Sequence, residues 1–290
     1  MKIFYKSKKT VANKTIWILW YQGYDNAPEI VKLCIKSWIK FNPDYQIVIL
    51  DKESLKQYIS LPDSVSPENK KDISIAHYSD LCRIALLKDL GGCWADATAF
   101  CCKSLNAWLP DYYSAGFFTF RNPAPERMMA NWFMAGEPDN IILTKLYTEL
   151  LSLYESNIFE NQNTDFGRQL VQALSPLLNK NYKSTLLWHS DIIVKGLKVY
   201  PYFIFHYTFN KLILENPNCR KVWEKVKIFD AKPALSLNFL EKSIEENKLH
   251  KAIQEIKKHQ CPMYKLSWKI DANREYWDAI VENLLTEFGL

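Results

Sequence analysis

The stretch that most limits how this chain can fold is residues 73–100, where an uninterrupted helical pattern is followed by paired glycines. Over residues 73–90 apolar side chains recur at helical spacing and no Pro or Gly intervenes, which predicts an amphipathic helix. Gly91 and Gly92 end it. Residues 93–100 alternate large apolar with small or polar side chains, which predicts a strand with one polar face.

Two polar features stand out in this stretch. Asp80 and Arg83 lie three positions apart on the apolar helix, and Asp96 and Thr98 lie two apart on the predicted strand, so each pair shares a face. An ion pair on a solvated helix face and an ordinary Asp at a strand end would explain them separately. Together they also fit a site in which strand-end oxygen atoms hold a divalent cation.

The same residues follow an order that resembles the A…SDxxR…GGxWxDxT core of the bacterial capsular polysaccharide synthesis family: Ala76, Ser79, Asp80, Leu81, Arg83, Gly91, Gly92, Trp94, Asp96 and Thr98. That family is related to the family 32 glycosyltransferases, whose core has an Asp-x-Asp motif after the same glycines. Further matches extend over nearly the whole chain, at Trp17 to Gln22, Asn131-Trp132-Phe133, Tyr202-Phe203 with His206, and Lys265-Leu266 with Lys269.

The resemblance implies a glycosyltransferase that moves a sugar from a nucleotide diphosphate donor, expected to be a UDP-sugar, to a growing capsular or surface glycan with retention of configuration. It assigns catalytic roles to Asp80, Arg83 and Asp96. It assigns a divalent cation, Mn²⁺ or Mg²⁺, to Asp96, Thr98 and His206. The implied donor-binding residues are Trp20, Tyr21, Gln22, Asp80, Arg83, Gly92, Ala95, Asp96, Asn131 and Lys265.

The implied fold is α/β and GT-A-like, a single Rossmann-type domain with a mostly parallel central sheet. We expect this domain over residues 1–235 and a helical C-terminal extension, packed on it, over residues 236–290. Local patterns agree at the start of the chain, where a strand over residues 15–21, a helix over residues 28–41 and a strand over residues 46–50 predict a parallel pair.

Ligands of open α/β sheets bind beyond the carboxyl ends of the strands, which places Trp20, Tyr21 and Gln22 at a site mouth. Trp20 and Tyr21 are equally well explained as core residues, since most of the 10 Trp and 16 Tyr must be structural. Asn131 similarly fits either a sugar contact or a strand end.

His206 lies in an aromatic segment, residues 197–209, that is strand-like. A lone His in such a segment is usually a satisfied core residue, whereas the family resemblance suggests a position near the diphosphate or the metal. Lys265 follows a lysine-rich helical region, where charges usually form a solvated face. A lysine folded back on the site would instead neutralise the leaving pyrophosphate.

Thr98 departs from the Asp-x-Asp pattern, because a hydroxyl replaces the second carboxylate. The loss of one formal charge should weaken metal binding and leaves Asp96 as a metal or a ribose ligand. A competing interpretation is therefore a non-catalytic carbohydrate- or nucleotide-binding protein that kept the fold and lost the metal site.

Composition excludes other classes. The formal charge of +5 is compatible with an anionic substrate or a membrane surface, and the dispersed lysines do not indicate nucleic acid. Seven scattered Cys form a poor disulfide framework, and neither a signal peptide nor a membrane-spanning run is present. We expect a cytoplasmic protein, either free or at the inner face of the membrane, whose acceptor is a glycan, free or lipid-linked. The sequence leaves the oligomeric state open.

Overall fold

The structure is a computed structural model that describes residues 13–258, 260–269 and 273–290. Its main strands and helices, with short 3₁₀ segments between them, follow the chain as β1 Thr15–Leu19, α1 Glu29–Phe41, β2 Gln46–Leu50, α2 Ile75–Asp89, β3 Gly92–Ala95, β4 Ala99–Cys101, β5 Phe117–Ala124, β6 Arg127–Gly136, α3 Ile141–Glu155, α4 Asp165–Leu178, α5 Ile204–Glu215, α6 Pro217–Trp223, α7 Lys232–Glu241, α8 Lys248–Lys257, β7 Met263–Lys265 and α9 Arg274–Phe288.

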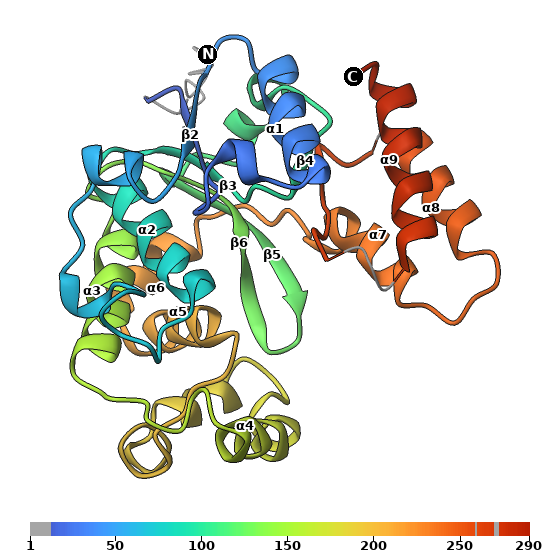
Figure 1. Cartoon of the computed structure of the whole chain (residues 1–290). Coiled ribbons are helices and arrows are strands. Elements are labelled where there is room, and N and C mark those ends of the chain that lie inside the picture. Colours follow the sequence, from blue (N-terminus) through green and yellow to red (C-terminus); the bar gives the residue numbers. More distant parts are fainter. Residues whose placement is uncertain (1–12, 259, 270–272) are drawn as a thin grey trace, which may run out of the picture.

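The central sheet has five strands in the order β2-β1-β3-β6-β5 (Figure 1). β1 pairs in parallel with both β2 and β3, whereas β6 pairs antiparallel with β3 and β5. Within this sheet β6 therefore runs opposite to the other four strands. The expected α/β fold with a mostly parallel central sheet is confirmed, as is the parallel pair at the start of the chain.

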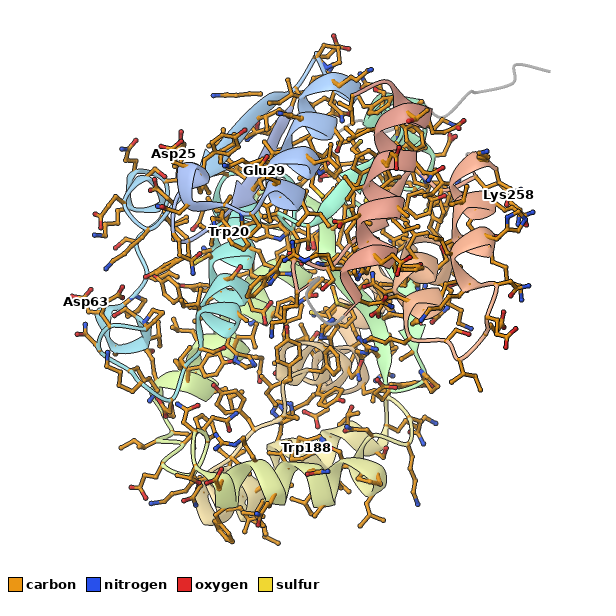
Figure 2. The ribbon with its side chains drawn as sticks, turned by 45° about the vertical axis from the view of Figure 1, so that its right-hand side comes forward. Trp20, Asp25, Glu29, Asp63, Trp188 and Lys258 are labelled. Atoms are coloured by element: carbon orange, nitrogen blue, oxygen red, sulfur yellow. The ribbon has the colours of Figure 1, made fainter. Side chains whose placement is uncertain are left out.

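Alternating side chains of β1 pack into two separate hydrophobic cores, one on each face of the sheet. Ile16 and Ile18 belong to the core under α1, while Trp17 and Leu19 belong to the core under α2, as the period of two along a strand requires. The sheet is thus covered on both faces. Charged side chains such as Asp63 and Lys258 lie at the periphery, as Figure 2 shows.

The C-terminal helices join the α1 side. α7, α8 and α9 bury apolar side chains in the same core as α1 and β4, and α8 lies beside α9 (Figure 1). The expected boundary between residues 235 and 236 lies inside α7. None of the helices in the described part of the chain combines the length and the apolar character that crossing a membrane requires.

Two predicted strands are wrong. Residues 93–100 do not form one strand, because the chain turns at residues 96–98, where Ala99 N–H donates to the Asp96 carbonyl at 2.8 Å. β4 then leaves the central sheet and pairs with β7. Residues 197–209 are not strand-like but end in the helix α5, since a buried aromatic run has the same pattern in a strand and in a buried helix.

Candidate active site

A cavity of about 730 Å³ lies beyond the carboxyl ends of β1 and β3, within the range typical of ligand sites. The turn after β1 and the turn at residues 96–98 form part of its wall. Most of the remainder comes from α2, β6, α5, α7 and the end of β7, and from the segments that precede α5 and follow β7. Five basic side chains and two carboxylates line it: Arg83, Arg127, Lys242, Lys265, Lys269, Asp80 and Asp96. The cavity thus favours an anionic ligand.

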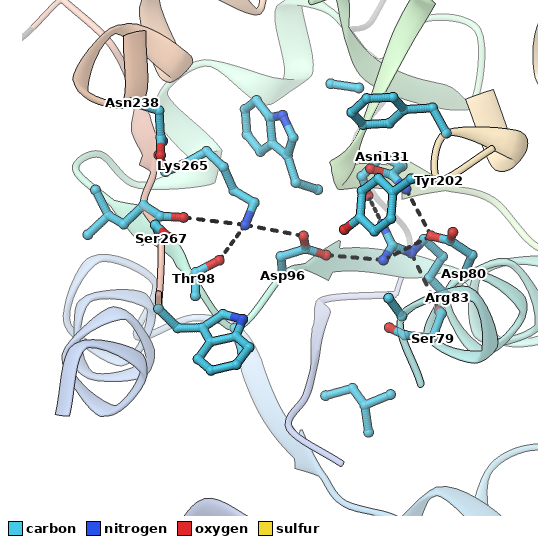
Figure 3. A pocket seen from close by; sticks show the side chains of 18 of the residues that line it. Ser79, Asp80, Arg83, Asp96, Thr98, Asn131, Tyr202, Asn238, Lys265 and Ser267 are labelled. Atoms are coloured by element: carbon cyan, nitrogen blue, oxygen red, sulfur yellow. Dashed lines mark hydrogen bonds and ion pairs between the residues drawn. The ribbon is translucent and has the colours of Figure 1, made fainter. Parts of the chain in front are cut away.

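Asp96 is fixed at the centre of the cavity wall by its backbone and by three donors. Its N–H donates to the Trp132 carbonyl at 2.8 Å, which holds the turn against β6. Its Oδ1 accepts from the Trp94 indole at 2.9 Å and lies 3.3 Å from Arg83 Nη2. Its Oδ2 lies 3.5 Å from Lys265 Nζ (Figure 3). Asp96 is therefore placed between two cations.

Arg83 connects α2 to the two strands beneath it. Its guanidinium pairs with Asp80 at 3.2 Å and with Asp96, and donates to the Asn131 carbonyl and weakly to the Ser79 carbonyl. The guanidinium carbon, Cζ of Arg83, also lies 5.0 Å from the Trp94 ring centroid. Because protein acceptors engage these donors, Arg83 is suited to positioning the two carboxylates rather than to reaching a phosphate.

Asp80 and Asn131 complete this network. The Asn131 amide donates to Asp80 Oδ1 at 2.8 Å, and both residues line the cavity. Burial raises the pKa of Asp80 to about 7; Arg83 and the Asn131 amide oppose this rise, whereas the nearby charge of Asp96 adds to it. The structure therefore brings together the predicted Asp80, Arg83, Asp96 and Asn131, and the solvated-face alternative for Asp80 and Arg83 is wrong.

Lys265 reaches the same point from the far end of the chain. β7 pairs antiparallel with β4, which sets Lys265 opposite Ala99, and Leu266 N–H donates to the Thr98 carbonyl at 2.8 Å. From there Lys265 Nζ donates to the Thr98 hydroxyl as well as facing Asp96 (Figure 3). Lys265 lies in the cavity wall, as the resemblance suggested, and not on a solvated helix face.

His206 also lines the cavity, from α5, and is buried. Its Nδ1 has no hydrogen-bond partner among the described residues, so it is not a core His with that nitrogen satisfied. Burial lowers its pKa well below the usual value, and the charges of Arg127 and Arg83 lower it further. The side chain is a neutral imidazole that faces a basic environment.

The predicted metal ligands do not fit a divalent cation. Asp96 Oδ2 and the Thr98 hydroxyl, the oxygens that would bind it, both face the Lys265 ammonium. The two arginines that depress the His206 pKa would also repel a metal there. Among the described residues no three His, Cys, Asp or Glu side chains form a group that could hold a metal.

The turn after β1 brings the predicted aromatic residues to the cavity. Trp20 meets Trp268 edge to face, with the ring centroids 6.0 Å apart, while Tyr21 meets Tyr78 in the same way. The Tyr21 hydroxyl donates to Glu68 at 2.8 Å. Trp20, Tyr21 and Gln22 all line the cavity, so their donor-binding role stays a prediction that the placement permits.

Gly92 and Ala95 do not line the cavity, contrary to their predicted donor-binding role. Ala95 is fully buried in the α1-side core. Gly92 lies at the opposite end of β3 and has φ of 93°, and a Cβ there would lie 2.6 Å from the Thr15 carbonyl oxygen. Gly92 is therefore required for the close approach of β3 to β1.

Sequence reasoning did not select several of the lining side chains, among them Tyr202, Trp268 and Arg127. Tyr202 and Trp268 are 67% and 49% exposed, which is unusual for large aromatic residues at a cavity. Arg127 lies over the Phe203 ring at 4.0 Å. The only signal for Tyr202 and Trp268 was their place in segments that resemble the family, and Arg127 had no signal at all.

The family is decided by comparison with known proteins. The model of the family described as capsular polysaccharide synthesis protein matches residues 2–166, more than half of the chain. The chain belongs to the capsular polysaccharide synthesis protein family. The match includes the network of Asp80, Arg83, Asp96 and Asn131, whereas Lys265 lies beyond its end.

Two curated relatives of this chain are named O-glycosyltransferases. It is 27% identical over 147 residues to O-glycosyltransferase braB of Annulohypoxylon truncatum, covering 44% of this chain and 35% of that protein. It is 24% identical over 163 residues to O-glycosyltransferase PaGT of Phomopsis amygdali, covering 51% and 40%. The chain thus matches two fifths or less of each relative's length.

A solved structure, PaToxG Glycosyltransferase, is similar with a TM-score of 0.36 and 19% sequence identity, covering 69% of this chain and 84% of that one.

Proposed function

We propose that this protein is a glycosyltransferase that binds a nucleotide-sugar donor in the cavity and transfers the sugar to a hydroxyl group. The observation that carries the proposal is the placement of Asp96, at the end of β3, in a basic cavity of about 730 Å³. Its membership of the family and the names of its relatives support the same reaction class.

The chemistry requires stabilisation of opposite charges at neighbouring points. The leaving nucleoside diphosphate gains negative charge while the anomeric carbon becomes positive. The basic side chains lining the cavity meet the first need. Asp96 would stabilise the positive charge on the anomeric carbon, or orient a donor hydroxyl, because Arg83 and the Trp94 indole fix its carboxylate in place.

The resemblance to family 32 enzymes makes retention the expected stereochemistry. Both carboxylates that line the cavity are paired with Arg83, so we assign neither as a covalent nucleophile. Transfer from the front face, in which the leaving diphosphate takes the acceptor proton, needs no protein nucleophile. NMR of the product linkage tests the stereochemistry.

The acceptor and donor identities are part of the proposal. The family description supports a capsular or surface glycan, which is lipid-linked if the enzyme works at a membrane. UDP-sugars are the first donors to test. The +5 charge is compatible with peripheral attachment to the inner face of a membrane from the cytoplasm.

The test incubates the protein with a panel of nucleotide sugars and detects nucleoside diphosphate release and glycan products by mass spectrometry. Asp96→Asn should slow transfer about a hundredfold, equivalent to roughly 3 kcal/mol of transition-state stabilisation, and keep the fold. Asp25→Asn, at an exposed carboxylate outside the cavity (Figure 2), is the matched control and should keep full activity.

Two outcomes would contradict the proposal. Wild-type turnover in the Asp96→Asn protein would remove Asp96 from the reaction. Binding of nucleotide sugars with neither hydrolysis nor transfer would favour the non-catalytic binding protein instead.

A further inference from the structure

The position between Asp96 and Thr98 is already occupied by a cation that belongs to the chain. Lys265 Nζ donates to the Thr98 hydroxyl and lies 3.5 Å from Asp96 Oδ2. These are the two oxygens that a divalent ion held by this turn would use. A metal ion and the ammonium therefore compete for one place.

Resting on the function proposed above, we propose that the Lys265 ammonium takes the place of the divalent cation, so that the enzyme binds the donor diphosphate without metal. Lys265 would contact the diphosphate directly, from the side opposite Asp96. An ammonium is a compact charge with three donors. Besides Asp96 and Thr98, Lys265 Nζ has only a long contact of 3.5 Å with the Leu266 carbonyl, which it can exchange for a phosphate oxygen.

Charge balance explains why Thr98 and Lys265 occur together. The formal charges of two carboxylates and one divalent cation sum to zero, and so do those of one carboxylate and one ammonium. A carboxylate at position 98 would add a negative charge that Lys265 alone cannot balance, whereas the Thr98 hydroxyl accepts a hydrogen bond without adding charge. The departure from Asp-x-Asp is thus matched by a lysine that the fold delivers to the same point.

The fold holds Lys265 firmly at its backbone and loosely at its tip. Pairing of β7 with β4 fixes the strand, and the Asn238 amide donates to the Lys265 carbonyl. The side chain is 22% exposed, so Nζ remains open to the cavity. Since an ammonium brings half the charge of a divalent ion, Arg127, Lys242 and Lys269, which line the same cavity, would supply the remainder.

The test titrates UDP, GDP, CDP and dTDP by calorimetry and continues with the tightest binder, once with EDTA and once with Mn²⁺. Wild-type affinity should agree within twofold between the two conditions. Lys265→Met should weaken binding at least tenfold in EDTA. Lys258→Met is the matched control, since Lys258 is exposed (Figure 2) and does not line the cavity, and it should change affinity less than threefold.

A second variant restores the alternative site. In Lys265→Met combined with Thr98→Asp, two carboxylates flank a vacated position, so Mn²⁺ should tighten nucleotide binding at least tenfold. Circular dichroism verifies that each variant is folded.

The outcomes separate this inference from the proposed function. Wild-type binding that EDTA abolishes, unchanged affinity in Lys265→Met, or a double variant that ignores Mn²⁺ would each overturn the role of Lys265 and leave a glycosyltransferase in place. Folded wild-type protein that binds none of the four nucleotides and transfers no sugar in either condition would overturn the proposed function, and this inference with it.

Discussion

Arg83 and Lys265 approach the same carboxylate from opposite sides, yet the structure holds them differently. The Arg83 side chain is 6% exposed and engages Asp80, Asp96 and the Asn131 carbonyl together. Lys265 is held at its tip by the Thr98 hydroxyl, by Asp96 and, at 3.5 Å, by the Leu266 carbonyl. A planar, multiply bonded guanidinium fixes geometry, while an ammonium with few partners and solvent access can exchange one partner for a ligand.

The difference teaches that charge alone does not define a ligand contact. Both side chains are positive and lie within 3.5 Å of Asp96, but Lys265 is the more exposed of the two, 22% against 6%, and its third contact is only a long one of 3.5 Å with the Leu266 carbonyl. We therefore separate a positioning side, built from α2 and β6, from a ligand-facing side built from the turn after β3 and from β7. The predictions below test that separation.

The largest expected effect is on stability, from Arg83→Lys. A lysine cannot bond to both carboxylates and the Asn131 carbonyl at once, so Asp80 is left buried without full compensation. The variant should lose about 3 kcal/mol of unfolding free energy, or roughly 6–12 °C in Tm. Differential scanning calorimetry measures this, with Lys265→Met as the comparison, expected to lose less than about 1 kcal/mol. Equal losses of unfolding free energy in the two variants would contradict the distinction between a positioning side and a ligand-facing side.

The second effect is a pH dependence on the positioning side. The folded-state pKa of Asp80 is raised to about 7, so its contribution to stability is fully present below the unfolded pKa near 4 and is lost as the pH rises through 7. Asp80→Asn cannot titrate, so its stability relative to wild type should rise between pH 5 and pH 8, by roughly 5–10 °C in Tm.

Thermal unfolding at both pH values measures the effect, and Asp25→Asn, at an exposed position of a short 3₁₀ helix, should show no such change relative to wild type. A constant difference between Asp80→Asn and wild type across this range would show that Asp80 is ionised throughout.

The smallest effect belongs to Thr98→Val, which removes one acceptor from Lys265 and leaves Asp96. The loss of one hydrogen bond to a charged group that keeps a second partner should weaken nucleotide binding about threefold. Thr98→Ser retains the hydroxyl and should bind like wild type in the same calorimetric titration. If the Ser and Val variants weaken binding equally, Thr98 acts through packing and not through Lys265.

Local patterns were sufficient for most of the fold. Helix α2 and the pair of β1 and β2 lie within two residues of their predicted bounds, because hydrophobic periodicity and glycine or proline boundaries decide such elements locally. The turn at residues 96–98 was missed because alternation is equally compatible with one strand and with two short ones. β3 ends there because β4 pairs with β7, a strand far along the chain.

The site residues also divide into those that local spacing could predict and those that it could not. Asp80, Arg83 and Asp96 come from one short stretch, where spacing on a helix and after a strand already indicates that they meet. The contact of Lys265 with Thr98 had no signal in the sequence, because the resemblance placed Lys265 only near the donor pyrophosphate. The metal expectation was drawn from spacing, which can show two oxygens side by side but not the ammonium that the fold places between them.

The pairing of β4 with β7 also sets the order in which the protein matures during synthesis. Thr98 and Lys265 are separated by 167 positions, so at roughly 5–20 residues per second the turn emerges on the order of ten seconds before its lysine. During that interval the nascent chain carries Asp96 without its second cation. The ability to hold a diphosphate would therefore be acquired late, only after β7 has joined β4.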